Sequence, residues 1–210
     1  MLNYLLVAIG TSVIGWIVWR LYSKRHTLPC PAWLSWMVEL DNPFAKGHKA
    51  SEIVNALAMQ KGMRVLDIGC GPGRVLLPLA QKIAKVGGHV TGLDIQSEML
   101  DKTLARAKHL KINNINFIHG DIDKVPMKQS YNVILMVCIL GEIPKASHKP
   151  VMQKVARHLK REGIISITET IFDPHFQSHK AVVQLMRAVG FKEVKFIGNR
   201  LAYTAHFKKI

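Results

Sequence analysis

From residue 46 onward, short apolar runs alternate with segments whose apolar residues recur at helical spacing. The apolar runs predict strands and the intervening segments predict helices. The predicted strands cover residues 63–69, 89–95, 114–120, 131–140 and 163–170. The predicted helices cover residues 46–60, 73–86, 97–110, 148–160 and 177–190. Regular alternation of the two kinds of element indicates a mainly parallel sheet with helices on both faces.

The C-terminal tail breaks this alternation. The stretch "KEVKFIGNRLAYTAHFKK" contains two runs of alternating apolar and polar residues, separated by Gly198, Asn199 and Arg200. Two such runs around a short turn predict a hairpin, whose strands must be antiparallel. The sequence therefore predicts an α/β fold with a seven-stranded sheet, in which five parallel strands precede an antiparallel pair.

The first apolar stretch of the chain has a different character. Residues 2–19 carry no charge, and this is about the minimum length for a helix that crosses a bilayer. Trp16 and Trp19 lie at its end, where interfacial aromatic residues are common. Basic residues follow at 20–26 and predict that the rest of the chain is cytoplasmic. A cleaved signal peptide is the alternative, but no basic residue precedes the run and no typical cleavage site follows it.

The next segment predicts a linker close to the membrane. Pro29 and Pro31 end any preceding helix, and Trp33 and Trp36 then recur at helical spacing. The segment is either an amphipathic piece on the membrane surface or a strap packed against the following domain. Cys30 is either an acylation site or an inert thiol. The chain thus divides into an anchor with its basic flank (1–28), a linker (29–45) and a globular domain (46–210).

Charge and cysteine content narrow the range of partners. The formal net charge is +15, which favours nucleic acid, anionic lipid or an acidic substrate without choosing among them. Three cysteines without a CxxC pair make a disulfide framework or a structural zinc site improbable. No metal site is expected, and a reducing compartment suits the globular domain.

The stretch "VLDIGCGPGR" (65–74) follows the first predicted strand of the sheet. In an open parallel sheet, ligands bind beyond the carboxyl ends of the strands, and glycines let the main chain approach a ligand closely. The spacing departs from the G-x-G-x-x-G pattern of dinucleotide sites, because the third glycine comes one residue early. Asp67 would repel a pyrophosphate but suits a cationic amino group, such as that of S-adenosylmethionine.

Two more carboxylates end the next two strands. Asp94 follows "HVTGL" and can accept hydrogen bonds from ribose hydroxyls. Asp121, in "FIHGDI", can accept one from an adenine amino group. A single Asp at a strand end is usually a turn or a helix cap. Three of them at successive strand ends behind a glycine loop indicate a nucleoside site.

These motifs resemble a known family. Residues 46–209 are similar to class I S-adenosylmethionine-dependent methyltransferases of the broad type 11 kind. The resemblance rests on "VLDIGCGPGR", "GLDIQSEML", "HGDIDKVPM" and "YNVILMVCILGEIP", and on "LKREGIISITE" near the fifth strand. Arg161 and Glu162 replace the Pro-Gly usual there, and Gly141 and Glu142 stand where many relatives carry a histidine or an aromatic residue. The resemblance implies a Rossmann-like methyltransferase fold, here preceded by one transmembrane helix.

The resemblance also implies a set of cofactor-binding residues. They are Asp67, Gly69, Gly71, Gly73, Asp94, Ile95, Met99, Asp121, Ile122, Val137 and Cys138. Asp67 and the glycines would border the methionine portion, and Asp94 would hold the ribose, with Ile95 and Met99 beside the adenosine. Asp121 and Ile122 would frame the adenine, and Val137 and Cys138 would form the floor near the methyl group.

The acceptor side is less defined by the sequence. Methyl transfer from a sulfonium depends largely on positioning, and a base is needed only for a protonated acceptor. Glu142 and His175 are the candidate catalytic residues, and Glu169 and Asp173 lie near the same strand ends. A capping or surface role is the alternative for Glu142 and for His175.

We expect a small-molecule or lipid-like acceptor reached from the membrane, such as a phospholipid amine or a quinone precursor. The predicted anchor and the basic surface favour this hypothesis, because Lys and Arg near anionic lipid each contribute about 1 kcal/mol of attraction. One alternative is a protein or RNA methyltransferase at the membrane. Nucleic acid is disfavoured, because no RNA-binding module is evident and "VCILGEIP" stands where many nucleic-acid enzymes carry N-P-P-Y. A second alternative is a non-catalytic, membrane-tethered nucleoside-binding module.

Overall fold

The computed structural model describes residues 47–210, together with Gly10, Gly15, Val18, Cys30, Pro31 and Ser35. The anchor predicted at residues 2–19 therefore lies outside the described residues, apart from three positions. Within the described part of the chain, no helix has the length and apolar character needed to cross a membrane.

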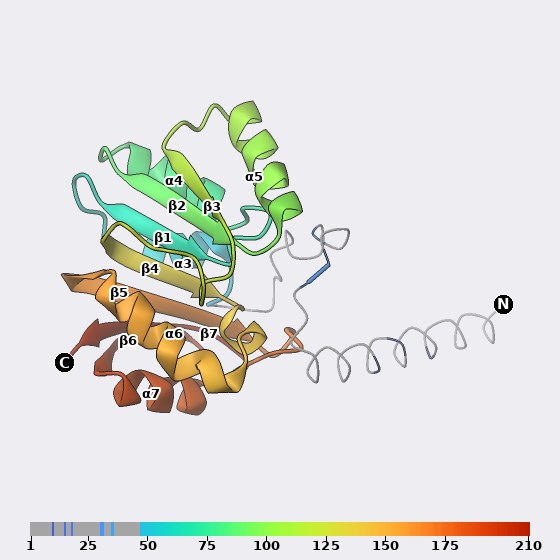
Figure 1. Cartoon of the computed structure of the whole chain (residues 1–210), viewed down its shortest axis with the longest axis vertical. Helices are drawn as coiled ribbons and strands as arrows, with labels where there is room; N and C mark the ends of the chain where they lie inside the picture. Colours follow the sequence, from blue (N-terminus) through green and yellow to red (C-terminus); the bar gives the residue numbers. More distant parts are fainter. Residues whose placement is uncertain (1–9, 11–14, 16–17, 19–29, 32–34, 36–46) are drawn as a thin grey trace.

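One seven-stranded sheet forms the centre of the domain (Figure 1). Its strands are β1 (Arg64–Ile68), β2 (His89–Asp94), β3 (Ile115–His119), β4 (Tyr131–Val137), β5 (Leu159–Thr170), β6 (Phe191–Gly198) and β7 (Ala202–Lys209). The strand order is β3-β2-β1-β4-β5-β7-β6. Strands β1 to β5 pair in parallel, as the alternating pattern predicts.

The C-terminal hairpin is present, and it makes the sheet mixed. Strand β7 pairs antiparallel with both β5 and β6. It lies between them, so β6 runs in the same direction as β5 at the edge of the sheet. The turn is closed by Asn199, whose Oδ1 accepts hydrogen bonds from the backbone N–H groups of Leu201 (2.8 Å) and Ala202 (3.1 Å).

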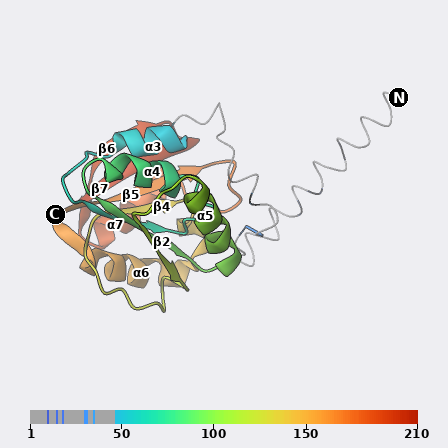
Figure 2. The same ribbon diagram turned by 90° about the horizontal axis from the view of Figure 1, so that it is seen from above.

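Helices cover both faces of the sheet (Figure 2). They are α3 (Ala50–Ala56), α4 (Leu76–Ala84), α5 (Ser97–His109), α6 (Lys145–Arg157) and α7 (His179–Ala188). Two hydrophobic cores result. One joins α3, α4 and α5 to one face of the sheet, and the other joins α6 and α7 to the opposite face. The alternate side chains of each strand supply both cores, because successive residues of a strand point to opposite faces.

Some element bounds differ from the sequence prediction. The helix predicted at 46–60 is much shorter as α3, because the chain is extended at Leu57. Strand β5 begins at Leu159 rather than 163, since Leu159 pairs with Tyr131 before a register shift between Tyr131 and Val133. A bulge of this kind cannot be read from an apolar pattern.

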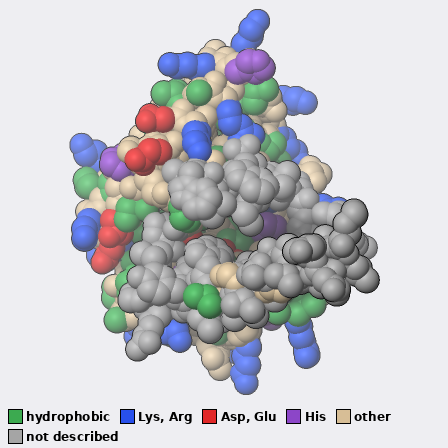
Figure 3. Space-filling model, turned by 90° about the vertical axis from the view of Figure 1, so that its right-hand side faces the viewer, with side chains coloured by type: hydrophobic (Ala, Val, Ile, Leu, Met, Phe, Trp, Pro, Cys, Tyr) green, Lys and Arg blue, Asp and Glu red, His purple; other side chains and the backbone are tan. Residues whose placement is uncertain are grey.

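Strands β1 to β5 all end at the right-hand edge of the domain in Figure 1. We call this the carboxyl edge. Figure 3 shows this side of the molecule, and Lys and Arg side chains project around much of its periphery. The carboxyl edge also carries the glycine loop after β1, and this is the edge at which open parallel sheets bind ligands.

Candidate methyl-donor site

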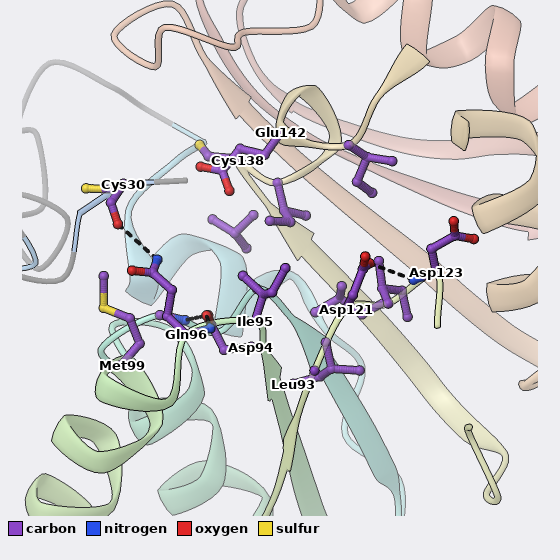
Figure 4. Close-up of a pocket in the computed structure, with 18 of the residues that line it drawn as sticks. Cys30, Leu93, Asp94, Ile95, Gln96, Met99, Asp121, Asp123, Cys138 and Glu142 are labelled. Carbon is purple, nitrogen blue, oxygen red and sulfur yellow. Dashed lines mark hydrogen bonds between the residues drawn. The ribbon is translucent and has the colours of Figure 1, made fainter. Parts of the chain in front are cut away.

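A pocket of about 490 Å³ opens at the carboxyl edge, a size within the usual range for small-molecule sites. Figure 4 shows its lining side chains converging from the ends of β2, β3 and β4. The sequence-predicted residues that line it are Gly69, Gly71, Asp94, Ile95, Met99, Asp121, Ile122, Val137, Cys138 and Glu142. The fold thus brings together residues from separate motifs around one cavity.

The glycine loop forms one wall of the pocket. The backbone N–H of Gly69 donates to the carbonyl of Leu93 (2.7 Å), which joins the loop to the end of β2. Gly69 has φ +69°, and a Cβ there would lie 2.7 Å from Cδ1 of Ile139. Only glycine fits this close approach. Gly71 instead faces open space, because a Cβ at this position would meet no atom of the described residues within 4 Å.

Asp67 lies behind this wall rather than in the lining. It is 1% exposed, and its Oδ1 has no hydrogen-bond partner among the described residues. Burial and the neighbouring Asp94 raise the pKa of Asp67 to about 7, and Arg74 partly opposes the effect. A buried carboxylate of this kind is stabilised by a cation, so the arrangement fits a ligand with an ammonium group.

Asp94 is held in place by the backbone. Its Oδ2 accepts from the N–H of Gly71 (2.8 Å), and its Oδ1 accepts from the N–H of Gln96 (2.9 Å). Burial raises the pKa of Asp94, and these backbone hydrogen bonds limit the rise. An ionised carboxylate offers about four acceptor positions. The positions that the two backbone N–H groups leave open could accept hydrogen bonds from ribose hydroxyls.

The opposite end of the pocket is formed by the ends of β2 and β3. Asp121 lines the pocket while its Oδ1 accepts from the N–H of Asp123 (2.9 Å), which makes it a turn residue as well. Ile122 is buried beside it, and Met99 is buried on α5. In contrast, Ile95 is 51% exposed despite its position in the lining. Together these side chains form an apolar slot with one carboxylate, which fits an adenine ring.

Cys138 forms the floor of the pocket at the end of β4. Its φ is +56°, a conformation that is uncommon outside glycine and often marks functional sites. Its Sγ lies 3.4 Å from Nε2 of His48, which in turn lies 3.2 Å from a guanidinium nitrogen of Arg74. Burial raises the pKa of the Cys138 thiol well above its ordinary value, so the thiol is neutral. The sequence patterns did not indicate His48.

Three carboxylates gather on the acceptor side of this floor. Glu142 and Asp173 line the pocket, and Glu169 is buried behind them at the end of β5. Burial and the nearby Asp173 and Asp94 raise the pKa of Glu142 to about 8. Burial also raises the pKa of Glu169 well above its ordinary value, although its Oε2 accepts from the N–H of Gln177 (2.9 Å). This side of the pocket therefore holds weakly acidic carboxyl groups suited to proton transfer at neutral pH.

Two further predicted site residues, His175 and Gly73, do not line the pocket. His175 is buried, and its carbonyl oxygen would lie 1.9 Å from a Cβ on Gly141. Its backbone therefore packs against the loop after β4, while the neighbouring Asp173 reaches the pocket. Gly73 likewise stands where a Cβ would be 2.8 Å from Cγ2 of Thr103, in the contact between the glycine loop and α5.

Residues far upstream also contribute to the site. Cys30 lines the pocket, and its carbonyl accepts from Nε2 of Gln96 (3.0 Å; Figure 4). Its backbone also lowers the pKa of Glu142, which partly offsets the effect of burial. Ser35 is 4% exposed, and its Oγ accepts from Nζ of Lys102 (2.7 Å). These described residues of the linker contact the domain, as the strap alternative expects. No local sequence signal connects Cys30 to Gln96 or Glu142.

The match to known families decides the class of the protein. Residues 59–201, more than half of the chain, match the methyltransferase domain family. The chain belongs to this family. The demethylmenaquinone methyltransferase of Listeria welshimeri is 26% identical to it over 157 residues, which are 70% of this chain and 65% of that protein. The chain therefore spans slightly less than two thirds of that relative's length.

Solved structures agree on the fold of this methyltransferase domain. An S-adenosylmethionine-dependent methyltransferase from Aquifex aeolicus superposes with a TM-score of 0.71 at 16% identity, covering 87% of this chain and all of that one. The magnesium protoporphyrin IX methyltransferase of Synechocystis, solved with bound S-adenosylmethionine, gives 0.62 at 18% identity, covering 77% of this chain and 76% of that one. The predictions of a Rossmann-like methyltransferase fold, a methyltransferase domain and S-adenosylmethionine as cofactor are confirmed.

The described residues fit this cofactor. The partnerless oxygen of Asp67 matches an ammonium group, the fixed carboxylate of Asp94 matches a ribose, and the open space beside Gly71 admits the methionine portion. The individual binding roles of these residues stay predictions. In the described part of the chain, no cluster of three or more His, Cys, Asp or Glu residues is arranged to hold a metal ion.

Proposed function

We propose that this methyltransferase transfers a methyl group to a hydroxylated ring of a lipophilic quinone precursor. We further propose that residues 1–28 anchor it in a membrane as a single span, with the catalytic domain on the cytoplasmic side. The observation that carries the acceptor assignment is Glu142, a pocket-lining carboxyl group whose pKa is raised to about 8.

Glu142 suits an acceptor that must lose a proton from a hydroxyl group. A general base works best when its pKa lies near the operating pH, and a phenolic hydroxyl has a pKa of about 10. Ile139, Ile143 and Pro144 line the pocket beside Glu142 and give a ring an apolar surface. The combination of one poised carboxylate and apolar walls favours a hydroxylated aromatic acceptor over a strongly charged one.

The proposed reaction uses the chain mainly for positioning and for one proton transfer. The cofactor supplies an electrophilic methyl group on its sulfonium. Glu142 accepts the hydroxyl proton, and the released electron pair makes the ring carbon nucleophilic. That carbon would take the methyl group as the methyl–sulfur bond of the cofactor breaks. Its own proton would then pass to water, and Glu142 would return the first proton to the ring oxygen, which restores the hydroxylated ring. Burial keeps the proton affinity of Glu142 high, and like-charge repulsion from Asp173 adds to this effect.

Sequence features support the membrane location. Residues 2–19 carry no charge, and basic residues follow at 20–26. The net charge of +15 favours the anionic cytoplasmic leaflet. The Listeria welshimeri relative carries the name demethylmenaquinone methyltransferase, and a lipophilic acceptor of that kind would be reached from a bilayer.

An extraction assay tests the acceptor class. Full-length protein is incubated with methyl-labelled S-adenosylmethionine and native membranes, and the products are separated into neutral lipids, phospholipids and precipitated macromolecules. We expect label in the neutral lipid fraction. Label in phosphatidylethanolamine would assign a phospholipid amine, label in the precipitate would assign protein or RNA, and donor binding without any label would assign a non-catalytic role.

Matched variants test the roles of the base and the anchor. Glu142→Gln should lower kcat by roughly 10²–10⁴, the usual contribution of a general base, while the exposed Glu162→Gln should leave kcat unchanged. Deletion of residues 1–28 should release the protein from membranes and leave donor binding intact. A deletion variant that still pellets with membranes in high salt would contradict the proposed anchor.

A further inference from the structure

Three exposed apolar side chains lie together on the carboxyl edge, outside the pocket. Ile171 and Phe172 directly follow β5, and Leu201 directly precedes β7. They are 36%, 55% and 56% exposed, respectively. The backbone N–H of Ile171 donates to the carbonyl of Leu201 (2.7 Å), so the two segments are adjacent. We call these three residues the apolar tip.

The apolar tip is held in place rather than left on a loose loop. After Phe172, the N–H of Asp173 donates to the carbonyl of Thr170 (3.0 Å). The N–H of Gln177 donates to Glu169 (2.9 Å), and the hydroxyl of Tyr203 donates to the carbonyl of Gln177 (2.8 Å). These hydrogen bonds hold the loop in a conformation that leaves Ile171 and Phe172 exposed. Exposed apolar surface is unfavourable in water unless a partner covers it.

The loop that carries the apolar tip is also a wall of the pocket. Asp173 lines the pocket, and the preceding Phe172 is exposed to the outside. A surface that received Phe172 would therefore lie beside the acceptor side of the pocket, next to Glu142.

The charges around the apolar tip favour an anionic surface. Arg200 precedes Leu201 in the turn and is exposed. Lys180 in the first turn of α7 and Lys145 at the start of α6 are exposed as well, and both helices begin at the carboxyl edge. Among the described residues, the fully exposed acids of this edge lie at the β2–β3 side, where Glu98, Asp101 and Asp123 are found, and the half-buried Asp173 is the acid that adjoins Phe172. An apolar group flanked by cations is typical of proteins that dock on anionic lipid.

We propose that Ile171, Phe172 and Leu201 insert into an anionic lipid surface and place the acceptor side of the pocket against it. This inference rests on the membrane location in the proposed function and adds a second contact, made by the catalytic domain itself. The uncharged stretch at residues 2–19 of the same chain would keep that surface close. A lipophilic acceptor would then pass from the bilayer to the pocket along the Phe172–Asp173 loop.

Photo-crosslinking of the full-length protein tests the contact directly. Phe172→p-benzoylphenylalanine and, separately, Leu201→p-benzoylphenylalanine are reconstituted into vesicles of phosphatidylcholine with phosphatidylglycerol, and into vesicles of phosphatidylcholine alone. The matched control is Leu110→p-benzoylphenylalanine. Leu110 is 45% exposed and follows α5 at the opposite edge of the sheet. After irradiation, mass spectrometry of the digested protein identifies what each position has captured.

We expect roughly tenfold more lipid adduct at positions 172 and 201 than at 110, because interfacial insertion buries side chains about 5–10 Å deep. The adduct yield should fall when phosphatidylglycerol is left out. Capture of residues 32–46 of the same chain, or of a second copy, would overturn the proposal by naming another occupant, as would lipid yields equal to that at 110. Binding of S-adenosylhomocysteine by each variant confirms that it is folded.

The lipid contact of the apolar tip and the proposed function are tested by different measurements. Pelleting with membranes in high salt reports the anchor, and the extraction assay reports the acceptor, whereas the adduct at 172 requires neither turnover nor a known acceptor. An anchored, active protein without lipid adducts at 172 and 201 overturns the apolar tip alone. A protein that neither pellets nor forms these adducts overturns both the anchor and the tip.

Discussion

The buried carboxyl group of Asp67 should make donor binding depend on pH. In the free protein its pKa is raised to about 7 by burial and by Asp94. If the donor's ammonium group pairs with Asp67, the bound carboxylate is charged, and its pKa falls towards the ordinary value of about 4. Below pH 7 the donor must then displace a proton from Asp67, so its affinity should fall as the pH falls.

The expected change in donor affinity follows from the pKa values of Asp67 in the free and the donor-bound protein. Between pH 7 and pH 5, the fraction of free protein with ionised Asp67 drops from about one half to about one hundredth, while the bound form stays ionised. The affinity should therefore fall about fifty-fold, which corresponds to about 2.3 kcal/mol. Above pH 7 the donor's own α-amino group begins to lose its proton, with a pKa of about 7.7–8.0. The comparison is therefore restricted to pH 5–7.

Calorimetric titration with S-adenosylhomocysteine, which carries the same ammonium group, measures this dependence. Asp67→Asn should bind with nearly constant affinity over pH 5–7, and about tenfold more weakly than the unmodified protein at pH 5, because the donor-bound Asp67 is still ionised at that pH. Titrations in buffers of different ionisation enthalpy should show about one proton released near pH 6, and none for Asp67→Asn. Glu142→Gln is the control, because it removes another carboxyl group with a raised pKa. The reasoning is refuted if Asp67→Asn keeps the fifty-fold dependence, or if Glu142→Gln abolishes it.

Three further predictions concern the walls of the pocket. Asp94→Ala should weaken donor binding about a hundredfold by calorimetry, because a hydrogen bond to a charged group contributes about 1.5–3 kcal/mol, whereas the exposed Asp101→Ala should bind normally. Gly141→Ala should lower the free energy of unfolding by about 1–3 kcal/mol, since its Cβ would lie 1.9 Å from the His175 carbonyl oxygen; an unchanged denaturation midpoint would contradict this contact. Gln96→Ala should speed donor dissociation up to about tenfold in stopped-flow measurements, because it removes one hydrogen bond to Cys30 of about 0.5–1.5 kcal/mol; equal dissociation rates would mean that the contact does not retain the donor.

Much of the fold was predictable because its signals are local. The apolar runs around Val65, Val90 and Val133 are continuous because both faces of these strands are buried under helices. The Gly198–Arg200 turn separates two runs of period two, which identified the hairpin. The pairing of β7 between β5 and β6 was not readable, because it depends on contacts between distant parts of the chain.

In the candidate site, too, the residues with local sequence signals were predictable and those that depend on distant contacts were not. Asp94 and Asp121 follow strands that pair in parallel, so their meeting at one edge follows from the alternation of elements. The roles of Cys30 and His48 do not, because each reaches the pocket across a long stretch of chain. His175 is the predicted catalytic residue of its loop, but Asp173 is the one that lines the pocket, and its Oδ1 accepts from the N–H of His175 (2.6 Å).

The placement of charge suggests an order of binding. The chain is strongly basic, yet its pocket is lined by carboxyl groups. Burial raises the pKa of Asp67, behind the glycine loop, to about 7 and the pKa of Glu142 to about 8. In the free protein this limits the number of charged carboxylates at neutral pH. A bound donor would bring two positive charges, its ammonium group near Asp67 and its sulfonium above the Cys138 floor. The sulfonium would favour the ionised form of Glu142, so this residue would become an effective base only once the donor is in place. An acceptor that arrived first would meet a largely protonated Glu142, and the donor is therefore expected to bind before the acceptor.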